Sequence, residues 1–412
     1  MGRKIVKAIF PVVLISNLLV FSGVYPRTPP ARSAGSGGDL RYIVYIEAKN
    51  KYERSEIADI GIALDEINNS YVTGTATPRE LKKLKKTNLT FRSYNLETYL
   101  LDFPPADSVY HNYDEMLSFL KLLSEKYPQM TELMSIGKSL EGRDIWALHI
   151  SAKTPPSFEK PGIVFFGAHH AREHLSVEVP IYLANYLLEQ SGRSDIRDLI
   201  LNRDIWIIPM VNPDGTEFDI NPSYQSWRKN RKKNDNGSFG VDLNRNYGFQ
   251  WGKRGASPDP NSETYRGKAP FSEPETQVTR DFLLAHKNIK SLITYHSFSE
   301  LILYPWGYSY SPIDKPNDLN AFETMAKAMA KFTGYKPEQG SDLYLVSGEM
   351  CDWAYGELGI FAFTIELSPK SSFEGGFYPG NIIEKTVDVN IDAALYMIER
   401  AGHPYTPTLV LF

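Results

Sequence analysis

Histidine and carboxylate side chains stand where three apolar, strand-like segments of this sequence end. His170 and Glu173 follow the first segment, His296 follows the second, and Glu366 ends the third. Two imidazole nitrogens and one carboxylate, with a fourth position open to water, form the ligand set of a catalytic zinc ion. A His and a Glu three residues apart are more often a simple ion pair. The independent placement of His296 and Glu366 at other strand ends is what favours a metal site.

Four apolar runs, at residues 162–167, 205–211, 289–295 and 360–365, must bring these residues together. They alternate with helical patterns such as residues 177–190, which is typical of a sheet covered by helices on both faces. We therefore predict an α/β fold with a mixed, mostly parallel central sheet. Functional residues of such sheets lie just beyond the carboxyl ends of the strands, so the candidate ligands should meet at one edge.

A smaller unit is predicted in front of this sheet. Residues 41–47 alternate like a strand, residues 52–64 have helical spacing, and residues 77–86 begin with a Thr cap and a Pro in the first turn. We interpret residues 40–101 as a small α+β unit and residues 102–412 as the main domain.

The first residues have the pattern of an export signal. Residues 1–25 combine a basic start with a short apolar run, and residues 26–39 form a linker rich in Pro, Arg, Ser and Gly. A membrane anchor is the alternative, but the run is short for a spanning helix. Cys351 is the only cysteine, so an exported protein of this sequence is stabilised by its core and not by internal disulfides.

The overall charge is nearly balanced. Lys and Arg total 45 against 49 Asp and Glu, a formal net charge of -4. Such a balance gives no basic field for nucleic acid, so we expect no nucleic-acid partner. A monomer is the default expectation for the oligomeric state.

Together, the candidate residues carry a resemblance to a known family. From about residue 110 to about residue 400, the sequence resembles the zinc carboxypeptidases of the carboxypeptidase A type. Five motifs occur in the same order and spacing: His-Ala-Arg-Glu at 170–173, Trp-Arg-Lys-Asn-Arg at 227–231, Val-Asp-Leu-Asn-Arg-Asn at 241–246, His-Ser at 296–297 and Phe-Thr-Ile-Glu-Leu at 363–367. Segments 262–267, 299–305 and 352–355 are most similar to the bacterial carboxypeptidase T branch.

The resemblance implies removal of single amino acids from peptide C-termini, with zinc held by His170, Glu173 and His296 and water as the fourth ligand. It matches Glu366 to the general base and Arg228 to the residue that stabilises the oxyanion. The chemistry agrees, because zinc lowers the pKa of its bound water toward 7 and a nearby carboxylate can take the proton and pass it to the leaving amine. A fixed cation aimed at the developing negative oxygen adds electrostatic stabilisation.

Such an exopeptidase must also recognise a free terminal carboxylate, which a planar Arg side chain can bind through two hydrogen bonds. The resemblance gives this role to Arg245 together with Asn244. It matches Tyr344 to a mobile tyrosine that closes over the bound C-terminus, and Arg172 to a substrate-side arginine. Asp242 matches a residue that orients one zinc histidine.

The segment that matches the floor of the pocket for the C-terminal side chain contains Glu349 and Cys351. An acidic floor suits Lys or Arg, because a buried cation needs a partner, whereas an apolar floor suits apolar side chains. We therefore predict broad specificity for apolar and basic C-terminal residues. A cysteine nucleophile is an alternative role for Cys351, but a packed, pocket-lining thiol is commoner.

Four further positions bear on the match. Phe298 stands where many family members have Tyr, and Gln225 where some have Arg, so individual subsite contacts are expected to differ. His169 and His174 flank the first motif and are interpreted as structural.

The first unit also acquires a role from the resemblance. Residues 40–101 match an open-sandwich activation prodomain that covers the active-site cleft, with an accessory binding domain or a folding aid as alternatives. Cleavage is expected between residues 94 and 109, near Asp102, by an activating protease. Relatives of the carboxypeptidase T type bind structural calcium, which the acidic loops of this chain would permit, and no ligands are assigned.

The leading hypothesis is a secreted, extracellular zinc metallocarboxypeptidase, made as a precursor, that acts on the C-termini of peptides or proteins. A cell-wall peptide hydrolase or an amidase on the same scaffold is the main alternative, and Asn244 and Arg245 argue against it because they match recognition of a free carboxylate. A non-catalytic peptide-binding relative is the third, and Glu366 beside a full ligand set argues against that.

Overall fold

The computed structural model describes residues 41–67, 70–95, 109–153, 160–220 and 224–406. The predicted signal peptide, the predicted linker and the predicted cleavage position near Asp102 lie outside the described residues. None of the helices in the described ranges is long and apolar enough to cross a membrane.

The predicted small unit is a four-stranded antiparallel sheet with two helices. Its elements are β1 (Tyr42–Glu47), α1 (Lys51–Ile60), β2 (Ala63–Ile67), β3 (Tyr71–Ala76), α2 (Pro78–Leu84) and β4 (Phe91–Asn95). The strand order is β2-β3-β1-β4. Apolar side chains of β1, β3 and both helices form a separate core, which confirms the predicted α+β architecture.

Capping residues explain where the two helices of this unit begin and end. Asn50 caps α1 by accepting from two backbone N–H groups, and the helix ends at Gly61, whose φ of 108° suits only glycine. The helix predicted over residues 52–64 was therefore too long, because the residues after Gly61 form β2. At α2, Thr77 and Glu80 form a capping box on either side of Pro78, the predicted proline of the first turn.

The main domain contains the remaining helices and strands. They are α4 (Tyr113–Lys126), β5 (Thr131–Lys138), β6 (Asp144–Ile150), β7 (Gly162–Phe166), α5 (Leu175–Glu189), α6 (Ser194–Asn202), β8 (Asp204–Ile208), α7 (Pro213–Asp219), α8 (Pro274–Ala285), β9 (Ile289–Ser297), β10 (Leu301–Tyr304), α9 (Pro316–Thr333), β11 (Lys336–Gln339), α10 (Met350–Leu358), β12 (Phe361–Leu367) and α11 (Ile383–Arg400). Short 3-10 turns lie at Leu243–Arg245, Gly340–Asp342 and Ser372–Glu374.

The eight strands form one mixed sheet in the order β11-β10-β12-β9-β7-β8-β6-β5. The four apolar runs of the sequence are its adjacent central strands β12, β9, β7 and β8, and all three contacts between them are parallel. Antiparallel pairs occur toward the edges, at β10–β12, β6–β8 and β5–β6. The predicted mixed, mostly parallel sheet is confirmed.

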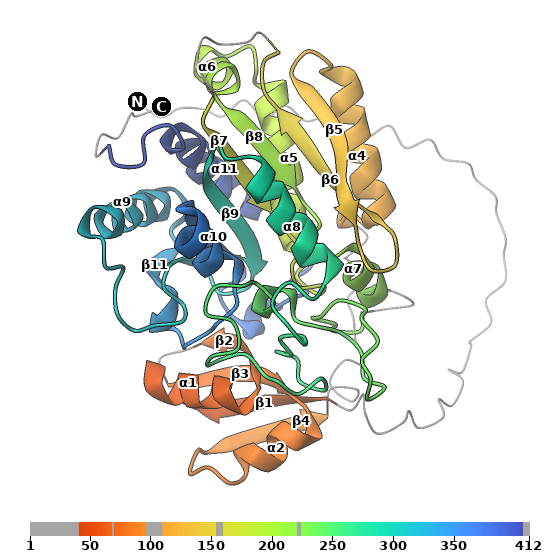
Figure 1. The fold of residues 1–412 in the computed structure, drawn as a ribbon, viewed down its shortest axis with the longest axis vertical. Coiled ribbons are helices and arrows are strands. Elements are labelled where there is room, and N and C mark those ends of the chain that lie inside the picture. The colour runs from red at the N-terminus through yellow and green to blue at the C-terminus, as the bar shows by residue number, and fades with distance from the viewer. Residues whose placement is uncertain (1–40, 68–69, 96–108, 154–159, 221–223, 407–412) are drawn as a thin grey trace, which may run out of the picture. The chain divides into compact units, whose positions relative to one another are not determined.

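Alternating side chains of the central strands feed two separate cores, one on each face of the sheet. On β7, Phe165 faces the core shared with α4, α5, α6, α9 and α11, and Phe166 faces the core shared with α8 and α10. Figure 1 shows α8 crossing one face and α5 and α11 covering the other. Fully burying one such side chain stabilises the fold by about 1.5–3 kcal/mol. The strand ends that carry the candidate ligands are thus fixed from both sides.

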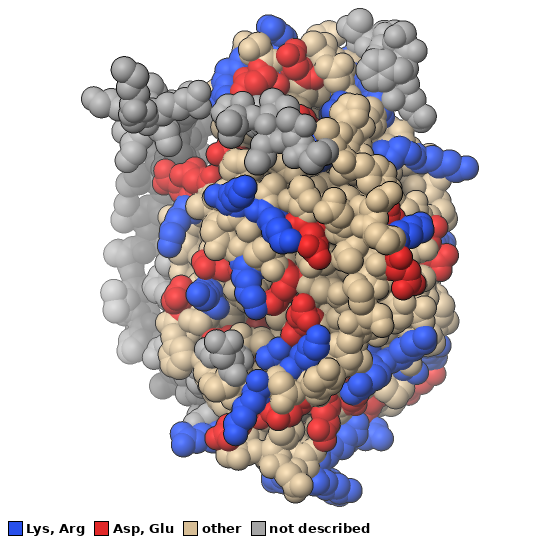
Figure 2. Space-filling model, turned by 90° about the vertical axis from the view of Figure 1, so that its left-hand side faces the viewer, with Lys and Arg blue, Asp and Glu red and all other residues tan. Residues whose placement is uncertain are grey.

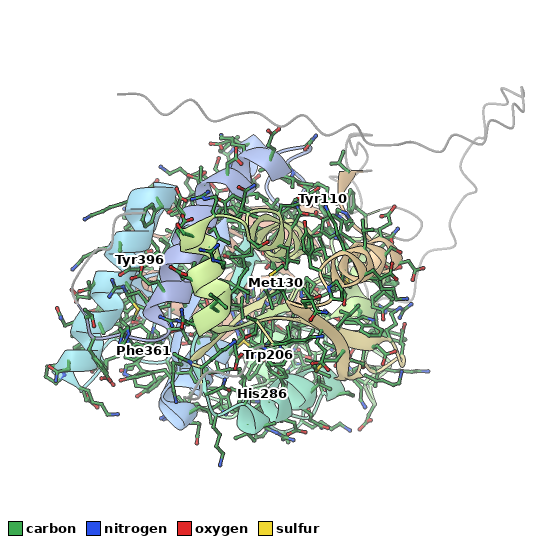
Figure 3. The ribbon with its side chains drawn as sticks, turned by 90° about the horizontal axis from the view of Figure 1, so that it is seen from above. Tyr110, Met130, Trp206, His286, Phe361 and Tyr396 are labelled. Atoms are coloured by element: carbon green, nitrogen blue, oxygen red, sulfur yellow. The ribbon has the colours of Figure 1, made fainter. Side chains whose placement is uncertain are left out.

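Aromatic packing holds the α8 side of the sheet. Trp206 on β8 lies edge-on to His286, which caps the C-terminus of α8, with ring centroids 4.7 Å apart (Figure 3).

On the surface, acidic and basic side chains are interspersed over the face in Figure 2. This mixture fits the small net charge.

Candidate active site

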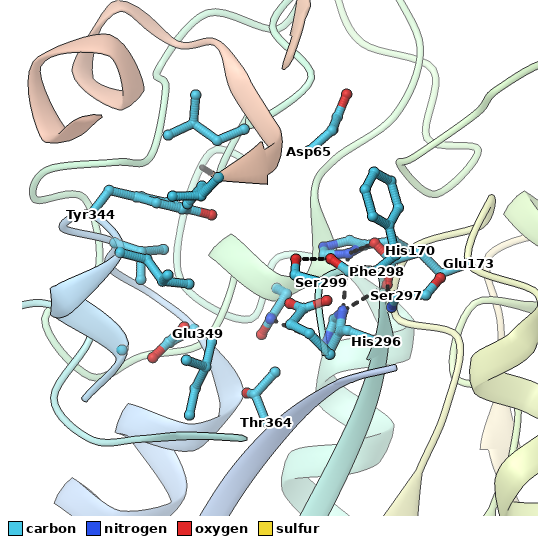
Figure 4. Close-up of a pocket in the computed structure, with 18 of the residues that line it drawn as sticks. Asp65, His170, Glu173, His296, Ser297, Phe298, Ser299, Tyr344, Glu349 and Thr364 are labelled. Carbon is cyan, nitrogen blue, oxygen red and sulfur yellow. Dashed lines mark hydrogen bonds and ion pairs between the residues drawn. The ribbon is translucent and has the colours of Figure 1, made fainter. Parts of the chain in front are cut away.

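Ten of the twelve predicted site residues line a single pocket at the carboxyl ends of the central strands: His170, Glu173, Arg228, Asn244, Arg245, His296, Tyr344, Glu349, Cys351 and Glu366. In Figure 4, Glu349 and Thr364 lie on one side of this pocket, and His170, Glu173 and His296 lie on the other. Two predicted residues do not line it. Asp242 lies behind His170, and Arg172 is fully buried under the N-terminal unit.

The loop between β7 and α5 places the first two candidate ligands. It begins at Gly167, where an added Cβ would lie 2.1 Å from the carbonyl oxygen of Ser176, so only glycine allows this close approach. Ser176 then accepts from the backbone N–H of Ala168 and donates to the carbonyl of Glu173. These contacts fix the loop that carries His170 and Glu173 against the start of α5.

The third candidate ligand, His296, and the candidate acid–base residue, Glu366, come from neighbouring strands. His296 is near the end of β9, and Glu366 is its direct register partner on β12. Because β9 and β12 are parallel neighbours, their carboxyl ends open on the same edge of the sheet, as the sequence predicted.

Three donor atoms converge as a metal site requires. His170 Nδ1 lies 2.7 Å from Glu173 Oε1, and His296 Nδ1 lies 2.8 Å from Glu173 Oε2. The two Nδ1 atoms are 3.1 Å apart. All three residues are buried, and their ligand atoms lie within 4.8 Å of one another.

This donor set fits zinc. A tetrahedral zinc with Zn–N bonds of about 2.0–2.1 Å separates its nitrogen ligands by about 3.3 Å, close to the spacing between the two histidines. Ligand nitrogens must be unprotonated, and two nitrogen lone pairs held this close to a carboxylate repel one another unless a cation lies among them. The residues therefore fit a bound zinc ion.

Asp242 connects the candidate ligands to a buried arginine. Its Oδ1 lies 3.1 Å from His170 Nε2 and also accepts from the backbone N–H of Asn244, and its Oδ2 accepts from Arg228 Nε at 3.0 Å. Burial alone would raise the pKa of Asp242, but the charges of Arg228, Arg245 and His170 hold it well below its usual value. A carboxylate is thus held against one ring nitrogen of His170.

Electrostatics keep Arg228 charged and Glu173 ionised. Burial opposes the charge on Arg228, but Asp242 and Glu173 outweigh this effect and raise its pKa. Burial also opposes the charge on Glu173, but the nearby His170 and His296 lower its pKa overall. The pocket therefore holds a fixed cation beside the metal ligands.

Glu366 is different from the other carboxylates of the site. Burial raises its pKa, Glu173 raises it further, and the opposing effects of His296 and the two arginines leave it at about 7. A carboxyl group with a pKa near neutrality can both accept and return a proton. Such a shift in a pocket is typical of groups that transfer protons, so Glu366 is the candidate for that role.

Asn244 and Arg245 are held by the backbone around the pocket. Asn244 Oδ1 accepts from the backbone N–H of Met350 at 2.9 Å, which turns its amide nitrogen toward His296. Arg245 donates to the carbonyls of Asn244 and Gly255, and its Nη2 lies 3.5 Å from the hydroxyl of Tyr344. An amide and a guanidinium thus face the same space as the metal ligands.

Arg172 pairs with a residue that sequence reasoning missed. Its Nη2 donates to Asp65 Oδ1 on β2 at 2.5 Å, and the other oxygen of Asp65 accepts from Thr75 Oγ1 at 2.9 Å. The guanidinium also lies over the ring of Phe377, 4.3 Å from its centroid. Asp65 itself lines the pocket. No local pattern identifies it, because its position depends on a contact 107 residues away in the chain.

The flanking residues pack around the metal site, and the ring of His169 stacks on that of His296. His169 is hydrogen-bonded to Tyr247 and Thr294, and His174 to Asp219. Phe298, the residue in place of the expected tyrosine, packs edge-on against Phe377, and the backbone carbonyl of Gln225 accepts from Arg41.

Cys351 Sγ lies 3.2 Å from the hydroxyl of Thr364, and burial raises the pKa of this thiol well above its usual value. A neutral, packed thiol is not an activated nucleophile.

For calcium, the described residues show no candidate site. Within the described ranges, no second group of three or more His, Cys, Asp or Glu side chains converges as the first one does. Structural calcium remains a prediction without ligands.

Comparison with known proteins agrees with this geometry. The family model described as "Zinc carboxypeptidase" matches residues 116–393. A zinc carboxypeptidase of Saccharothrix mutabilis subsp. capreolus is 34% identical over 86% of this chain and 87% of its own length, and a carboxypeptidase B of Astacus astacus is 35% identical over 67% and 92%. The crystal structure of the carboxypeptidase A from Helicoverpa armigera aligns with a TM-score of 0.73 at 25% identity, over 88% of this chain and 97% of that one.

Proposed function

The chain belongs to the zinc carboxypeptidase family and is a metallocarboxypeptidase that acts on peptide C-termini, and from this premise we propose that it is a secreted precursor with broad specificity and Glu366 as its general base. The observation that carries the proposal is the shared pocket. A His-Glu-His metal site, an acid–base carboxyl group and an Asn–Arg pair suited to a carboxylate all open into the same space. The further similarity of three segments to carboxypeptidase T remains a resemblance.

His170, Glu173 and His296 would hold the zinc ion. When bound, zinc acts as a Lewis acid and makes a nearby water molecule acidic enough to attack a carbonyl carbon near neutral pH. Asp242 fixes the ring orientation of His170. When Nδ1 of this histidine is unprotonated and free to bind the metal, Nε2 carries the proton and donates it in a hydrogen bond to Asp242.

Proton transfer is assigned to Glu366. Its carboxylate takes a proton from the attacking water and returns it to the amine that leaves. A pKa of about 7 supports this role, because the group is then ionised in part of the population and still acidic enough to donate.

Arg228 is assigned to the negative charge that develops on the carbonyl oxygen. Its guanidinium is buried, and Asp242 holds its Nε at 3.0 Å, so the remaining N–H groups keep a fixed direction. A preorganised cation of this kind stabilises the transition state without reorientation during the reaction.

Exopeptidase specificity is assigned to Arg245 and Asn244, which would bind the terminal carboxylate of the substrate. A guanidinium binds two carboxylate oxygens in one plane, and the amide nitrogen of Asn244 adds a further donor. The hydroxyl of Tyr344 lies beside Arg245, and this side chain would cover the bound C-terminus. An internal peptide bond offers no carboxylate here, so the pocket would select chain ends.

The N-terminal unit is proposed as the prodomain that keeps the precursor inactive. Asp65 places a carboxylate on Arg172 at the pocket, where the peptide would otherwise lie. The loop that carries Tyr344 is bound from the same side, since Lys51 pairs with Asp342 and Arg54 donates to the carbonyls of Asp342 and Leu343. Both contacts favour a closed pocket until the unit is released.

Broad specificity and export rest on separate features. Glu349 and Cys351 both line the pocket, which supports acceptance of both basic and apolar side chains. The basic and apolar pattern of residues 1–25 supports secretion.

The test is the release of free amino acid from blocked dipeptides that end in Phe, Leu, Arg or Glu. Processed protein should release Phe, Leu and Arg, a zinc chelator should abolish release, and Glu366→Gln should lose about a hundredfold or more in kcat. Absence of release by zinc-loaded, processed protein would refute the proposed function. Release that survives in Glu366→Gln would refute the assignment of the base.

A further inference from the structure

Two carboxyl groups meet at the floor of the pocket, at the start of α10. Glu349 is the N-cap residue of this helix and Asp352 lies in its first turn. Both lie against the backbone of Gly307: an added Cβ on that glycine would lie 2.5 Å from Glu349 Oε1, and its N–H donates to Asp352 Oδ1 at 2.9 Å. Each carboxyl group also shifts the pKa of the other, and two buried carboxyl groups this near to each other are best accommodated when one of them carries a proton.

Asp352 has the environment of the ionised member. Its Oδ1 accepts from the backbone N–H of Gly307 at 2.9 Å, and its Oδ2 accepts from Gly307 at 3.1 Å and from Tyr308 at 2.9 Å. Burial raises the pKa of Asp352 to about 7, but these backbone donors oppose that rise, and the first turn of a helix also favours negative charge. Asp352 is also fully buried, so it cannot reach a substrate itself.

Glu349 has the environment of the protonated member. Burial raises its pKa well above the usual range, and the charge of Asp352 raises it further. Arg245 opposes this shift, but three of its N–H groups are directed to the carbonyls of Asn244 and Gly255 and to Tyr344 and not to Glu349.

The other groups around Glu349 do not reverse this effect. Glu366 raises its pKa as well, and Cys351 and Tyr344, which line the same pocket, are neutral near pH 7 because burial raises the pKa of both. Tyr308, on the segment that binds Asp352, also has a raised pKa and is neutral. Unlike Asp352, Glu349 is partly exposed into the pocket, so a substrate side chain can contact it.

We propose that Glu349 and Asp352 share one proton, and that loss of this proton converts the floor of the pocket from a site for apolar C-terminal side chains into a site for Lys and Arg. Asp352 is a positioning residue that acts through Glu349. The inference rests on the proposed function, since it concerns the substrates of the same pocket.

The chemistry of the two states differs in a simple way. With the proton present, Glu349 is an uncharged carboxylic acid, and an apolar side chain can lie against it without leaving a buried charge unpaired. With the proton released to solvent, the pair carries two negative charges, which need a cation to compensate them. A bound guanidinium supplies that cation, so binding of a basic side chain should release up to one proton. Low pH therefore favours apolar C-termini, and high pH favours basic ones.

The first experiment follows selectivity against pH. The ratio of kcat/KM for blocked dipeptides ending in Arg and in Phe is measured from about pH 5 to about pH 9 with processed, zinc-loaded enzyme. The ratio should rise with pH, by up to about tenfold per pH unit while Glu349 is protonated, because one proton is lost for each Arg side chain bound. Glu349→Gln should cleave the Phe substrate and give a low, flat ratio. Asp352→Asn should shift the rise to lower pH, because the neighbouring negative charge is gone.

The second experiment counts protons without turnover and does not depend on the folding of Asp352→Asn. Calorimetry in two buffers of different ionisation enthalpy, with processed, zinc-loaded Glu366→Gln, should detect proton release on binding the Arg dipeptide and none for Phe. Glu357→Gln, an exposed acid on the same helix, is the matched control and should behave as wild type in the first experiment. A pH-independent Arg to Phe ratio, or no proton release with Arg, overturns the inference and leaves the proposed function intact. Failure to release either amino acid refutes the proposed function instead.

Discussion

Replacement of Asp65 with Asn should make the unprocessed precursor partly active. Asp65 is the charged residue of the N-terminal unit that pairs with Arg172, whose side chain is fully buried in this pair. Asn keeps the size and one acceptor oxygen but removes the charge. The guanidinium then stays buried without its principal counter-ion, since Glu263 lies 3.7 Å away. The closed precursor, in which the N-terminal unit covers the pocket, loses stability. The open precursor, in which this unit has moved away and water solvates Arg172, does not.

The size of the effect follows from the burial of the pair. Removing one partner of a buried ion pair costs about 3–5 kcal/mol. The introduced amide would still accept one hydrogen bond, and burial raises the pKa of Asp65 against the opposing effects of Arg172 and Arg228, so part of the gain from the charge is already offset. We therefore expect about 2 kcal/mol, which corresponds to about a thirtyfold larger open fraction.

The assay compares full-length precursor with processed enzyme on a small blocked dipeptide, at equal zinc loading. Asp59→Asn is the matched control, because Asp59 pairs with Arg254 at the same interface but their side chains are 32% and 50% exposed. Exposed pairs contribute about 0–1 kcal/mol, so this variant should rise about fivefold at most. Equal precursor activity in wild type and Asp65→Asn, with processing and folding unchanged, would contradict the proposed role of the ion pair.

Three further predictions concern the chemistry of the pocket. Removal of the metal with a chelator should abolish activity and lower the melting temperature, and zinc should restore both, because the three converging ligands repel one another without a cation; an unchanged melting temperature would argue against the site. The value of kcat/KM should fall with decreasing pH, with a midpoint between about pH 4.5 and about 7. Glu366 must be ionised to accept a proton, and a bound cation lowers its raised pKa. A value of kcat/KM that is flat from about pH 4 to about pH 8 would exclude Glu366 as the base. Arg245→Ala should raise KM by about a hundredfold or more with a smaller change in kcat, as expected for the loss of a charge-assisted bidentate contact; an unchanged KM would remove Arg245 from substrate binding.

The central strands and the metal ligands could be predicted because each leaves a local trace in the sequence. The run at residues 162–167 is apolar throughout, as a strand covered on both faces must be, and His170 and Glu173 follow it directly. His296 could be placed with them because parallel strands present their carboxyl ends on one edge. The roles of Asn244 and Arg245 came only from the family resemblance, since an Asn–Arg dipeptide has no specific chemistry of its own.

The features that the sequence could not provide depend on contacts between distant segments. Asp65 lies in an ordinary strand pattern, and its function arises only where β2 meets Arg172. The helix predicted over residues 52–64 was too long because its apolar spacing continues past Gly61, where the backbone turns into a left-handed conformation. The backbone of Gly307, a residue from a distant part of the chain, likewise lies against the carboxyl groups of Glu349 and Asp352, which no local pattern indicates.

The most direct test of the exopeptidase claim uses one peptide in two forms, with a free and with an amidated C-terminus. Mass spectrometry of a time course with processed, zinc-loaded protein should show residues lost one at a time from the C-terminus of the free form, while the amidated form stays intact because Arg245 and Asn244 have no carboxylate to bind. Cleavage at internal bonds, or equal cleavage of the amidated form, would contradict the account.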